Sequence, residues 1–437
     1  MPRTPFHACS LLTFCCLIGV TASVMSGQEQ ESGRSTSESH ETSEPPKDIQ
    51  PRWWKGNIHT HSLWSDGDDF PEMIASWYVD HGYNFLALSD HNTLSQGLRW
   101  MQVSDIEKRA GKVAMEKYLK RFGPSWVEVR GTPTDDDYAV RLKPLNEFRA
   151  LVEQAGKFIM LQGEEISDRA EGKPVHMNAT NLAQLITPIH GETVRETMQN
   201  NLRLVLEQEK ELGQEILPHL NHPNFGWAIT AEDLAHVIQE RFFEVYNGHP
   251  GVNHLGDETR PGIERMWDLA NAIRLGQLDA EPLLGVATDD SHEYHGEPGS
   301  RPGRGWVMVR SMFLTPEHLV RAMKAGDFYC SSGVELSSVT FDEVSKTLSL
   351  VVSPQPNASY HIDFIATLRS PTNHAPALET IGQIVSSVDG TTASYTLTGK
   401  ELYVRAVVTS SQPPVDPVFA DQRQQAWTQP VGWQVGK

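Results

Sequence analysis

The chain has 437 residues, of which 39% are hydrophobic and 21% are charged, ordinary values for a soluble globular protein. Its formal net charge of -19 argues against a protein that coats nucleic acid, because such proteins bind phosphates through a basic surface. The length allows two domains, one of which can be a large barrel.

The first residues have the pattern of an export signal. Arg3 gives a positive start, an apolar stretch runs from about Ala8 to Val24, and small residues follow. We predict a signal peptide over residues 1–26, and therefore an exported protein that works in the periplasm or outside the cell. The apolar stretch is short for a bilayer, so we expect no stable membrane span in the mature chain. Residues 27–51 are rich in Glu, Ser and Thr and predict a disordered acidic linker.

From residue 52 onward, short apolar runs alternate with amphipathic stretches, a pattern typical of α/β folds. The alternation predicts a parallel sheet closed into a barrel over residues 52–332. A charged insertion at about 100–140 is either a lid or a surface excursion. The expected strands are 57–61, 84–89, 158–162, 217–220, 242–246 and 283–287, and the expected helices are 70–81, 144–154 and 193–212.

The texture of the sequence changes after about Ser332. Short alternating runs are separated by Asn, Gly, Ser and Pro clusters at nearly regular spacing, which predicts a small all-β sandwich-like domain over residues 333–437. Its expected strands are 335–339, 347–352, 360–366, 392–398 and 403–408.

Residues of metal-ligand type follow several of the predicted barrel strands. Because the carboxyl ends of parallel barrel strands open onto one face, side chains from distant parts of the sequence are expected to meet there. One such pair is a weak signal, but a series at successive strand ends is specific. The candidate ligands are His59, His61, Asp66, His91, one of Glu164 and Glu165, His176, His222, one of Asp289 and Asp290, and His292.

The residue types indicate which metal is bound. Imidazole and carboxylate groups suit zinc, manganese or iron, whereas a thiolate site needs cysteines, and Cys330 is the sole cysteine beyond the predicted signal peptide. His59 and His61, two apart in a predicted strand, are expected to point the same way and to clasp one ion. The doublets Glu164-Glu165 and Asp289-Asp290 leave open which member is the ligand.

Taken together, these motifs resemble the PHP (polymerase and histidinol phosphatase) family of metal-dependent phosphoesterases over about residues 53–328. The resemblance implies a distorted (β/α)7-type barrel and favours the second member of each acidic doublet. The segment 322–329 and Ala426-Trp427-Thr428-Gln429-Pro430 resemble an exported branch of carbaryl hydrolase-type proteins. The motifs that carry the family resemblance are His59-x-His61, Ser65-Asp66-Gly67, Ser89-Asp90-His91-Asn92-Thr93, Gly163-x-Glu165-Ile166-Ser167, His176, His222-Pro223 and Asp290-x-His292.

The family resemblance implies two to three divalent metal ions. By it, His59, His61, Glu165 and Asp290 hold the first ion; Glu165, His176 and His222 hold the second; and Asp66, His91 and His292 hold the third. The resemblance also implies that Asp66, His91, Glu165 and Asp290 form the catalytic part of this site and that a metal-bridging hydroxide would hydrolyse small phosphoesters. The branch resemblance implies an alternative, the hydrolysis of carboxyl esters or carbamates.

Three residues outside this set are candidates for substrate contact. Arg301 and Arg304 lie in a Gly/Pro-rich stretch soon after His292, where a guanidinium can bind a phosphate or carboxylate through two hydrogen bonds. His249 is expected at the mouth of the site, because histidine titrates near neutral pH and can donate a proton to a leaving group. His219 is a candidate partner of His222.

Overall fold

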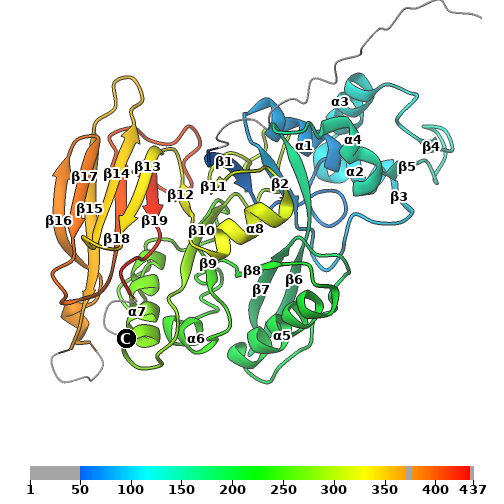
Figure 1. Ribbon diagram of the computed structural model, residues 1–437. Helices are drawn as coiled ribbons and strands as arrows, with labels where there is room; N and C mark the ends of the chain where they lie inside the picture. The colour runs from blue at the N-terminus through cyan, green and yellow to red at the C-terminus, as the bar shows by residue number, and fades with distance from the viewer. Residues whose placement is uncertain (1–49, 371–375, 434–437) are drawn as a thin grey trace, which may run out of the picture. The chain divides into compact units, whose positions relative to one another are not determined.

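The computed structural model of the protein describes residues 50–370 and 376–433 (Figure 1). The predicted signal peptide and almost all of the predicted linker lie outside these residues. In the two described ranges, no helix combines the length and the apolar character that crossing a bilayer requires.

The described residues form a mixed α/β protein. The helices are α1 (Pro71–Asp80), α2 (Val103–Ala110), α3 (Val113–Phe122), α4 (Leu145–Val152), α5 (Val194–Leu212), α6 (Ala231–His236), α7 (Ile263–Gly276) and α8 (Pro316–Lys324), with the 3₁₀ turn η1 (Leu378–Thr380). The strands are β1 (Arg52–Asn57), β2 (Phe85–Leu88), β3 (Arg99–Gln102), β4 (Val129–Arg130), β5 (Ala139–Leu142), β6 (Ile159–Ala170), β7 (Lys173–Thr180), β8 (Leu217–Leu220), β9 (Phe242–Asn247), β10 (Leu284–Thr288), β11 (Trp306–Ser311), β12 (Phe328–Ser331), β13 (Glu335–Asp342), β14 (Thr347–Ser353), β15 (Tyr360–Leu368), β16 (Gln383–Asp389), β17 (Thr392–Thr396), β18 (Glu401–Ser410) and β19 (Gln425–Thr428).

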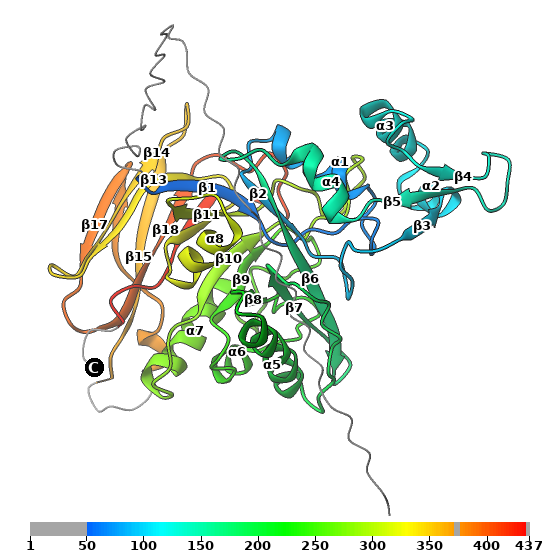
Figure 2. The same cartoon turned by 45° about the vertical axis from the view of Figure 1, so that its right-hand side comes forward.

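Thirteen of these strands form one sheet, in the order β10-β9-β8-β7-β6-β2-β1-β11-β12-β19-β18-β15-β16. The pairs β10/β9, β9/β8, β6/β2 and β2/β1 are parallel, and the other pairs are antiparallel. In both ribbon views, α5, α6 and α7 lie together along the part of the sheet that holds β6 to β10 (Figures 1 and 2). This sheet carries the candidate site.

The expected parallel, closed barrel is corrected by the strand pairing. β6 and β7 form an antiparallel hairpin whose two-residue turn, Glu171-Gly172, has φ angles of 52° and 75°. Positive φ at both positions is the requirement of the tight turns that join such hairpins. Among the described residues, β10 and β1 share no continuous pairing, and their extensions meet at an isolated bridge between Thr60 and Ser291. The sheet is therefore mixed, and a closed barrel is not confirmed.

Most of the predicted barrel elements are confirmed within a few residues. β2, β8, β9 and β10 and the helices α1, α4 and α5 lie where the apolar patterns placed them. The predicted position of the first strand, 57–61, was wrong: β1 ends at Asn57, so His59 and His61 follow the strand instead of ending it. β1 begins earlier because it pairs antiparallel with β11, a strand about 250 residues further along the chain, from Arg52 opposite Ser311 to Gly56 opposite Val307.

The insertion near residues 100–140 has its own small sheet and apolar cluster. β3, β5 and β4 pair in that order, and α2 and α3 pack with them. Ile106, Tyr118 and Val140 are buried together with Trp64 and Phe70 of the preceding segment. The insertion is thus a packed element that contacts the segment carrying Asp66.

The strands after residue 332 include a second sheet, β13-β14-β17, and the outer part of the main sheet. One apolar cluster contains Leu86 and Met308 from the predicted barrel and also Leu348 and Phe364 from beyond it. The pair Asp268 and Arg405 joins α7 to β18 through two buried hydrogen bonds of 2.9 and 2.7 Å. The boundary at 332/333 stays a prediction.

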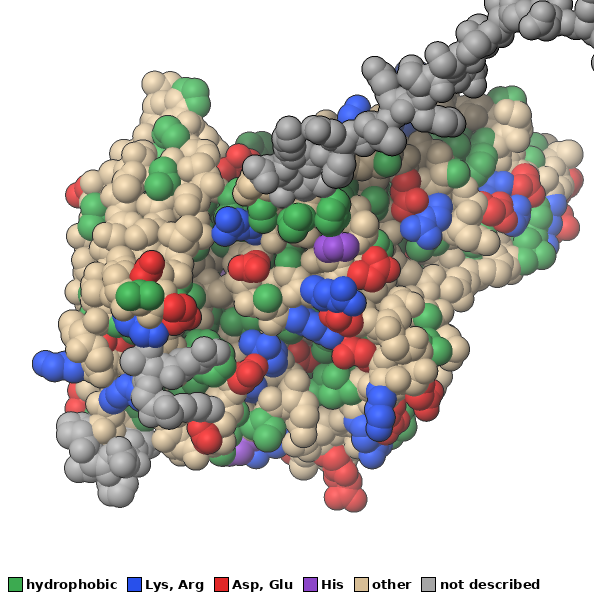
Figure 3. All heavy atoms as spheres, viewed as in Figure 1, with side chains coloured by type: hydrophobic (Ala, Val, Ile, Leu, Met, Phe, Trp, Pro, Cys, Tyr) green, Lys and Arg blue, Asp and Glu red, His purple; other side chains and the backbone are tan. Residues whose placement is uncertain are grey.

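Charged side chains of both signs are interspersed on the face shown in Figure 3. This face carries no broad area of one sign.

Candidate metal centre

The segments that carry the predicted ligands lie side by side. Thr60 forms a parallel bridge with Ser291, and its backbone oxygen accepts a hydrogen bond from the Ser89 N–H at 2.9 Å. His91 forms a second parallel bridge, with Glu165. The segment after β10 therefore lies beside the segment after β1, which lies beside the segment after β2, and that last segment lies beside β6. This arrangement brings together ligands that are distant in sequence.

Asp290 and Glu165 are the buried carboxylates around which the histidines gather. Asp290 Oδ1 lies 3.2 Å from Nε2 of His59 and 3.2 Å from Nε2 of His61. Glu165 approaches the same two nitrogens at 3.6 and 3.3 Å. Both histidines are fully buried, and Glu165 is 1% exposed. Two imidazoles and two carboxylates therefore face one another in a space closed to solvent.

Glu165 also reaches a second group of histidines. Its Oε1 lies 2.9 Å from Nδ1 of His176 and 3.5 Å from Nε2 of His222, and its Oε2 lies 2.7 Å from Nδ1 of His91. His176 reaches Glu165 because β7 turns back on β6 and places it opposite Ser167. This carboxylate is the member shared by both groups.

A third group lies at the exposed side of the centre. Asp66, whose side chain is 54% exposed, lies 3.4 Å from Nε2 of His91 and 3.4 Å from Nε2 of His292. The His61 and His292 rings are stacked with their centroids 4.0 Å apart. Ligand-type atoms of His61, Asp66, His91 and His292 all lie within 4.8 Å of one another. The structure therefore brings together all nine predicted ligands.

The structure separates the two acidic doublets. Glu164 points away from the histidines, and its Oε2 accepts a hydrogen bond from the Ile186 N–H at 2.9 Å. Asp289 accepts hydrogen bonds from the Tyr78 hydroxyl at 2.7 Å and from the backbone N–H groups of residues 303–305 at 2.7 to 2.9 Å. The second member of each doublet faces the histidines, and Asp290 has a φ of 48°, a left-handed conformation often found at functional sites.

Several buried polar atoms at the centre of this site form no hydrogen bond of good geometry among the described residues, although oppositely charged groups lie 2.7 to 3.6 Å from them. They are Nε2 of His59, Nε2 of His61 and Oε2 of Glu165. A buried polar atom without a partner costs free energy, on the order of 1–3 kcal/mol. All three are atoms that coordinate zinc, manganese or iron, so the residues present fit a divalent metal.

The charged groups of the site shift one another's pKa values. Burial lowers the pKa of His61 to about 3, and the nearby His292 acts in the same direction. Burial also opposes the charge on His91, but Glu165 and Asp66 outweigh it and raise its pKa to about 11. For His292, burial is likewise outweighed by nearby aspartates, which raise the pKa to about 9. The carboxylates thus attract positive charge strongly, and bound cations would compete with these protons.

Sequence reasoning missed Glu244, a fully buried glutamate on β9. Its Oε1 lies 2.6 Å from Nδ1 of His59 and accepts the Thr288 hydroxyl at 2.7 Å. Its Oε2 accepts the His222 N–H at 2.7 Å and the Asn247 side-chain amide at 2.8 Å. Glu244 therefore turns Nε2 of His59 toward the site. A glutamate in the middle of an otherwise apolar strand is the signal that could have revealed it.

Two asparagines that the sequence did not suggest hold the central carboxylates. Asn221 donates to Glu165 Oε1 at 2.7 Å, and Asn247 donates to Asp290 Oδ2 at 3.1 Å. His219, a predicted partner of His222, instead lies 3.5 Å from Glu244. The two asparagine amides thus hold the carboxylates of Glu165 and Asp290 in place.

The two arginines predicted to contact substrate are engaged within the protein. Arg304 is 4% exposed; it donates to Asp416 at 2.8 Å and to the backbone oxygens of Gly248 and Gly299, both at 2.7 Å. Arg301 also pairs with Asp416. These bonds favour a structural role for Arg304, because they use donors that a substrate would need. Arg301 uses one nitrogen for Asp416, and its side chain is 37% exposed.

His249, the third predicted substrate contact, lies beside the centre. Its ring centroid is 6.0 Å from that of His292 and 5.4 Å from that of Phe225. Burial lowers its pKa, so the ring is neutral at pH 7. The Gly251 N–H donates to its Nδ1 at 3.0 Å, which leaves the proton of the neutral ring on Nε2.

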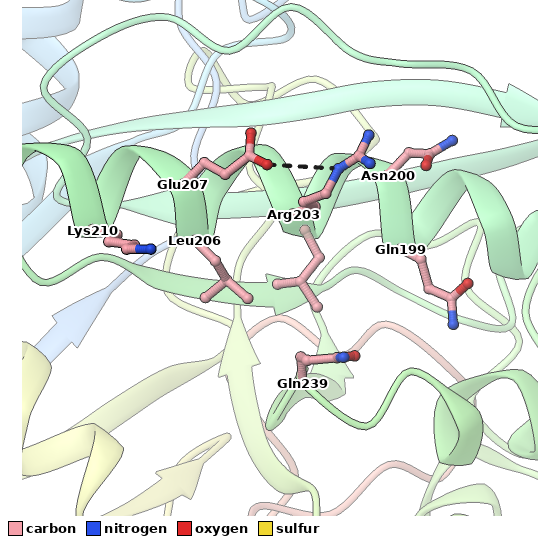
Figure 4. Close-up of a pocket in the computed structure, with 8 residues that line it drawn as sticks. Gln199, Asn200, Arg203, Leu206, Glu207, Lys210 and Gln239 are labelled. Atoms are coloured by element: carbon pink, nitrogen blue, oxygen red, sulfur yellow. Dashed lines mark ion pairs between the residues drawn. The ribbon is translucent and has the colours of Figure 1, made fainter.

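A hollow of about 420 Å³ on the surface of α5 is separate from this site (Figure 4). Arg203 and Glu207 form an ion pair of 3.9 Å there. With one carboxylate and no histidine, the hollow does not have the donors of a metal site. It is lined by Gln199, Asn200, Leu202, Arg203, Leu206, Glu207, Lys210 and Gln239.

Comparison with protein-family models gives no match, and comparison with the curated proteins gives none. Among the solved structures that match is a two-domain protein from Bacteroides vulgatus containing a predicted PHP-like metal-dependent phosphoesterase. It is 16% identical, with a TM-score of 0.38, and the match covers 87% of this chain and 95% of that one. A second, a predicted metal-dependent phosphoesterase from Bifidobacterium adolescentis, is 14% identical, with a TM-score of 0.28, and the match covers 58% of this chain and 92% of that one. Likeness at this level carries no argument about chemistry, so the inferences below rest on the geometry of the site.

Proposed function

We infer that the protein is a metal-dependent hydrolase that acts on small phosphoesters. The observation that carries this inference is the set of buried, unpartnered nitrogen and oxygen atoms of His59, His61 and Glu165 at the centre of a cluster of nine ligand-type side chains. Nothing in an apolar core would favour such an arrangement, whereas a divalent cation satisfies all three atoms.

Three sets of residues are the proposed ligands, and Glu165 is shared by the first two. The first set is His59, His61, Glu165 and Asp290; the second is Glu165, His176 and His222; the third is Asp66, His91 and His292. Each set matches side chains that contact one another directly. Divalent ions bound there would activate water as a nucleophile and neutralise the charge of a phosphoryl group.

His249 supplies the hydrogen-bond donor of the proposed site. Its neutral ring carries a proton on Nε2 and lies next to His292, so it can donate to an oxygen of a substrate held at the third set of ligands. Buried walls around His59, His61 and Glu165 exclude bulk water, which strengthens electrostatic interactions with a bound anion.

The test compares two variants at adjacent positions. Protein loaded with zinc, manganese or iron is assayed on para-nitrophenyl phosphate, bis(para-nitrophenyl) phosphate and para-nitrophenyl acetate, and its metal content is measured by elemental analysis. Glu165→Gln should lose at least about a hundredfold in kcat/KM and lower the occupancy of two sites together. Glu164→Gln is the matched control and should keep both, since Glu164 faces Ile186.

The outcomes separate the metal site from the reaction. Less than about one equivalent of metal after reloading would contradict the metal site itself. Turnover of the acetate ester without turnover of either phosphoester would refute the phosphoesterase assignment and leave the carboxyl-ester alternative. For a phosphoesterase, inorganic phosphate should inhibit competitively.

A further inference from the structure

A segment from the far end of the chain contacts the candidate site. Residues 411–424 connect β18 to β19 and lie against the turn that follows β9. Asp416 in this segment binds both Arg301 and Arg304, and Arg304 in turn donates to the backbone oxygen of Gly248 at 2.7 Å. A carboxylate of the C-terminal part therefore anchors the backbone next to His249 through one buried guanidinium.

Two further contacts join the same partners. The side-chain amide of Gln422 donates to the Tyr246 hydroxyl at 2.9 Å, and the ring of Phe419 lies 5.5 Å from that of His254. His254 stacks on Tyr246 at 5.0 Å and its Nε2 lies 2.8 Å from the Asn247 backbone oxygen. The segment thus contacts Tyr246 and His254, which precede and follow residues 247–249 in the chain.

That turn is linked directly to a proposed metal ligand. Asn247 donates its side-chain amide to Asp290, and its side-chain oxygen accepts the His249 N–H at 2.7 Å. Gly248 fits tightly, because a Cβ there would lie 2.5 Å from the backbone oxygen of Asp289. A small displacement of this turn would therefore move the His249 donor and the amide that holds Asp290.

We propose that the segment 416–422 is a positioning element of the active site, with Asp416 holding the 247–249 turn through Arg304. The proposal rests on the function inferred above, and it gives the C-terminal part a role in substrate binding. It also reassigns the two arginines: both bind Asp416 instead of the substrate, and Arg304 also holds the backbone of Gly248. The two roles predict opposite effects when the charge of Asp416 is removed.

Asp416→Asn provides the test, with Asp421→Asn as the matched control, since Asp421 is an exposed aspartate of the same segment. If Asp416 positions the turn, KM for para-nitrophenyl phosphate and Kd for inorganic phosphate should both rise by roughly three- to tenfold, because small errors in positioning weaken binding of the reacting group. Metal content should change little, because all nine proposed ligands are kept, and kcat should change less than KM. If the arginines bind substrate, their release from Asp416 should tighten phosphate binding instead. Unchanged or tighter phosphate binding would overturn the proposal.

Amide hydrogen exchange gives a second readout that does not depend on any activity. Exchange in peptides covering residues 246–252 should be faster in Asp416→Asn than in the wild type, and unchanged in Asp421→Asn. Unchanged exchange in Asp416→Asn overturns the positioning role. If the wild type turns over no phosphoester, the proposed function fails while the exchange result still decides whether the segment holds the turn. Gln422→Met, which removes the contact with Tyr246, should act in the same direction and serves if Asp416→Asn does not fold.

Discussion

Replacement of Glu244 by glutamine would reveal whether this buried carboxylate sets the protonation of His59. One oxygen of Glu244 faces His59 Nδ1 and the Thr288 hydroxyl, and the other accepts the His222 N–H and the Asn247 amide. Glutamine keeps the shape of glutamate but exchanges one acceptor oxygen for an NH₂ donor. The position that this donor takes determines the consequence for the site.

On the side of His222, the new donor would face a backbone N–H that cannot accept, at a cost of about 1–3 kcal/mol. On the other side, the Thr288 hydroxyl can rotate, and His59 can accept at Nδ1 if its proton moves to Nε2. We therefore expect the amide nitrogen next to His59 and a proton on Nε2, the atom that faces Asp290 and Glu165. Because a protonated nitrogen cannot bind an ion, metal affinity should fall by about 10- to 100-fold, equivalent to about 1.4–2.7 kcal/mol.

Calorimetric titration of metal-free protein with zinc or manganese measures this loss, and nitrogen NMR of the imidazole rings identifies which nitrogen of His59 carries the proton. Glu240→Gln is the matched control. Glu240 is also buried and accepts hydrogen bonds from the N–H groups of Arg241 and Phe242, but it contacts no proposed ligand. If Glu244→Gln binds metal within about twofold of the wild type, Glu244 does not orient His59 and the reasoning is refuted.

Two predictions concern stability. Burial raises the pKa of Glu240 from 4.5 to about 7. Between these pH values the folded state holds a proton that the unfolded state releases. The free energy of unfolding of the wild type should therefore fall as the pH rises from about 4.5 through 7. Glu240→Gln removes this dependence on pH. In urea unfolding, the free energy of unfolding of the variant should rise relative to that of the wild type by up to about 3 kcal/mol between pH 4 and pH 8. Parallel stability profiles of the two proteins would contradict the assignment. Arg405→Leu leaves Asp268 buried without its charged partner and should lower the free energy of unfolding by about 3–5 kcal/mol. A loss under about 1 kcal/mol would show that the pair does not hold α7 to β18.

Local sequence patterns were sufficient for the central strands and for the kind of site. β2, β8 and β10 are short runs buried along their whole length, so their apolar residues stand out from the amphipathic helices between them. Histidine and carboxylate residues after such strands are uncommon in a core, so they indicated a metal site, and the family resemblance then selected the nine candidate ligands.

The choice between neighbouring residues depended on contacts over long distances in the chain. Glu164 and Glu165 are equivalent in sequence, and the pairing of β6 with β7 determines which of them faces His176, since alternate residues of a strand point to opposite sides. Arg304 follows the site closely in sequence, but the partner that it binds, Asp416, lies more than a hundred residues further along the chain. Glu244 could not be identified from an apolar strand alone, because its role depends on His59, a residue that lies 185 positions earlier in the chain. The sequence shows which chemical group each residue carries, but only the tertiary structure shows which other residue that group contacts.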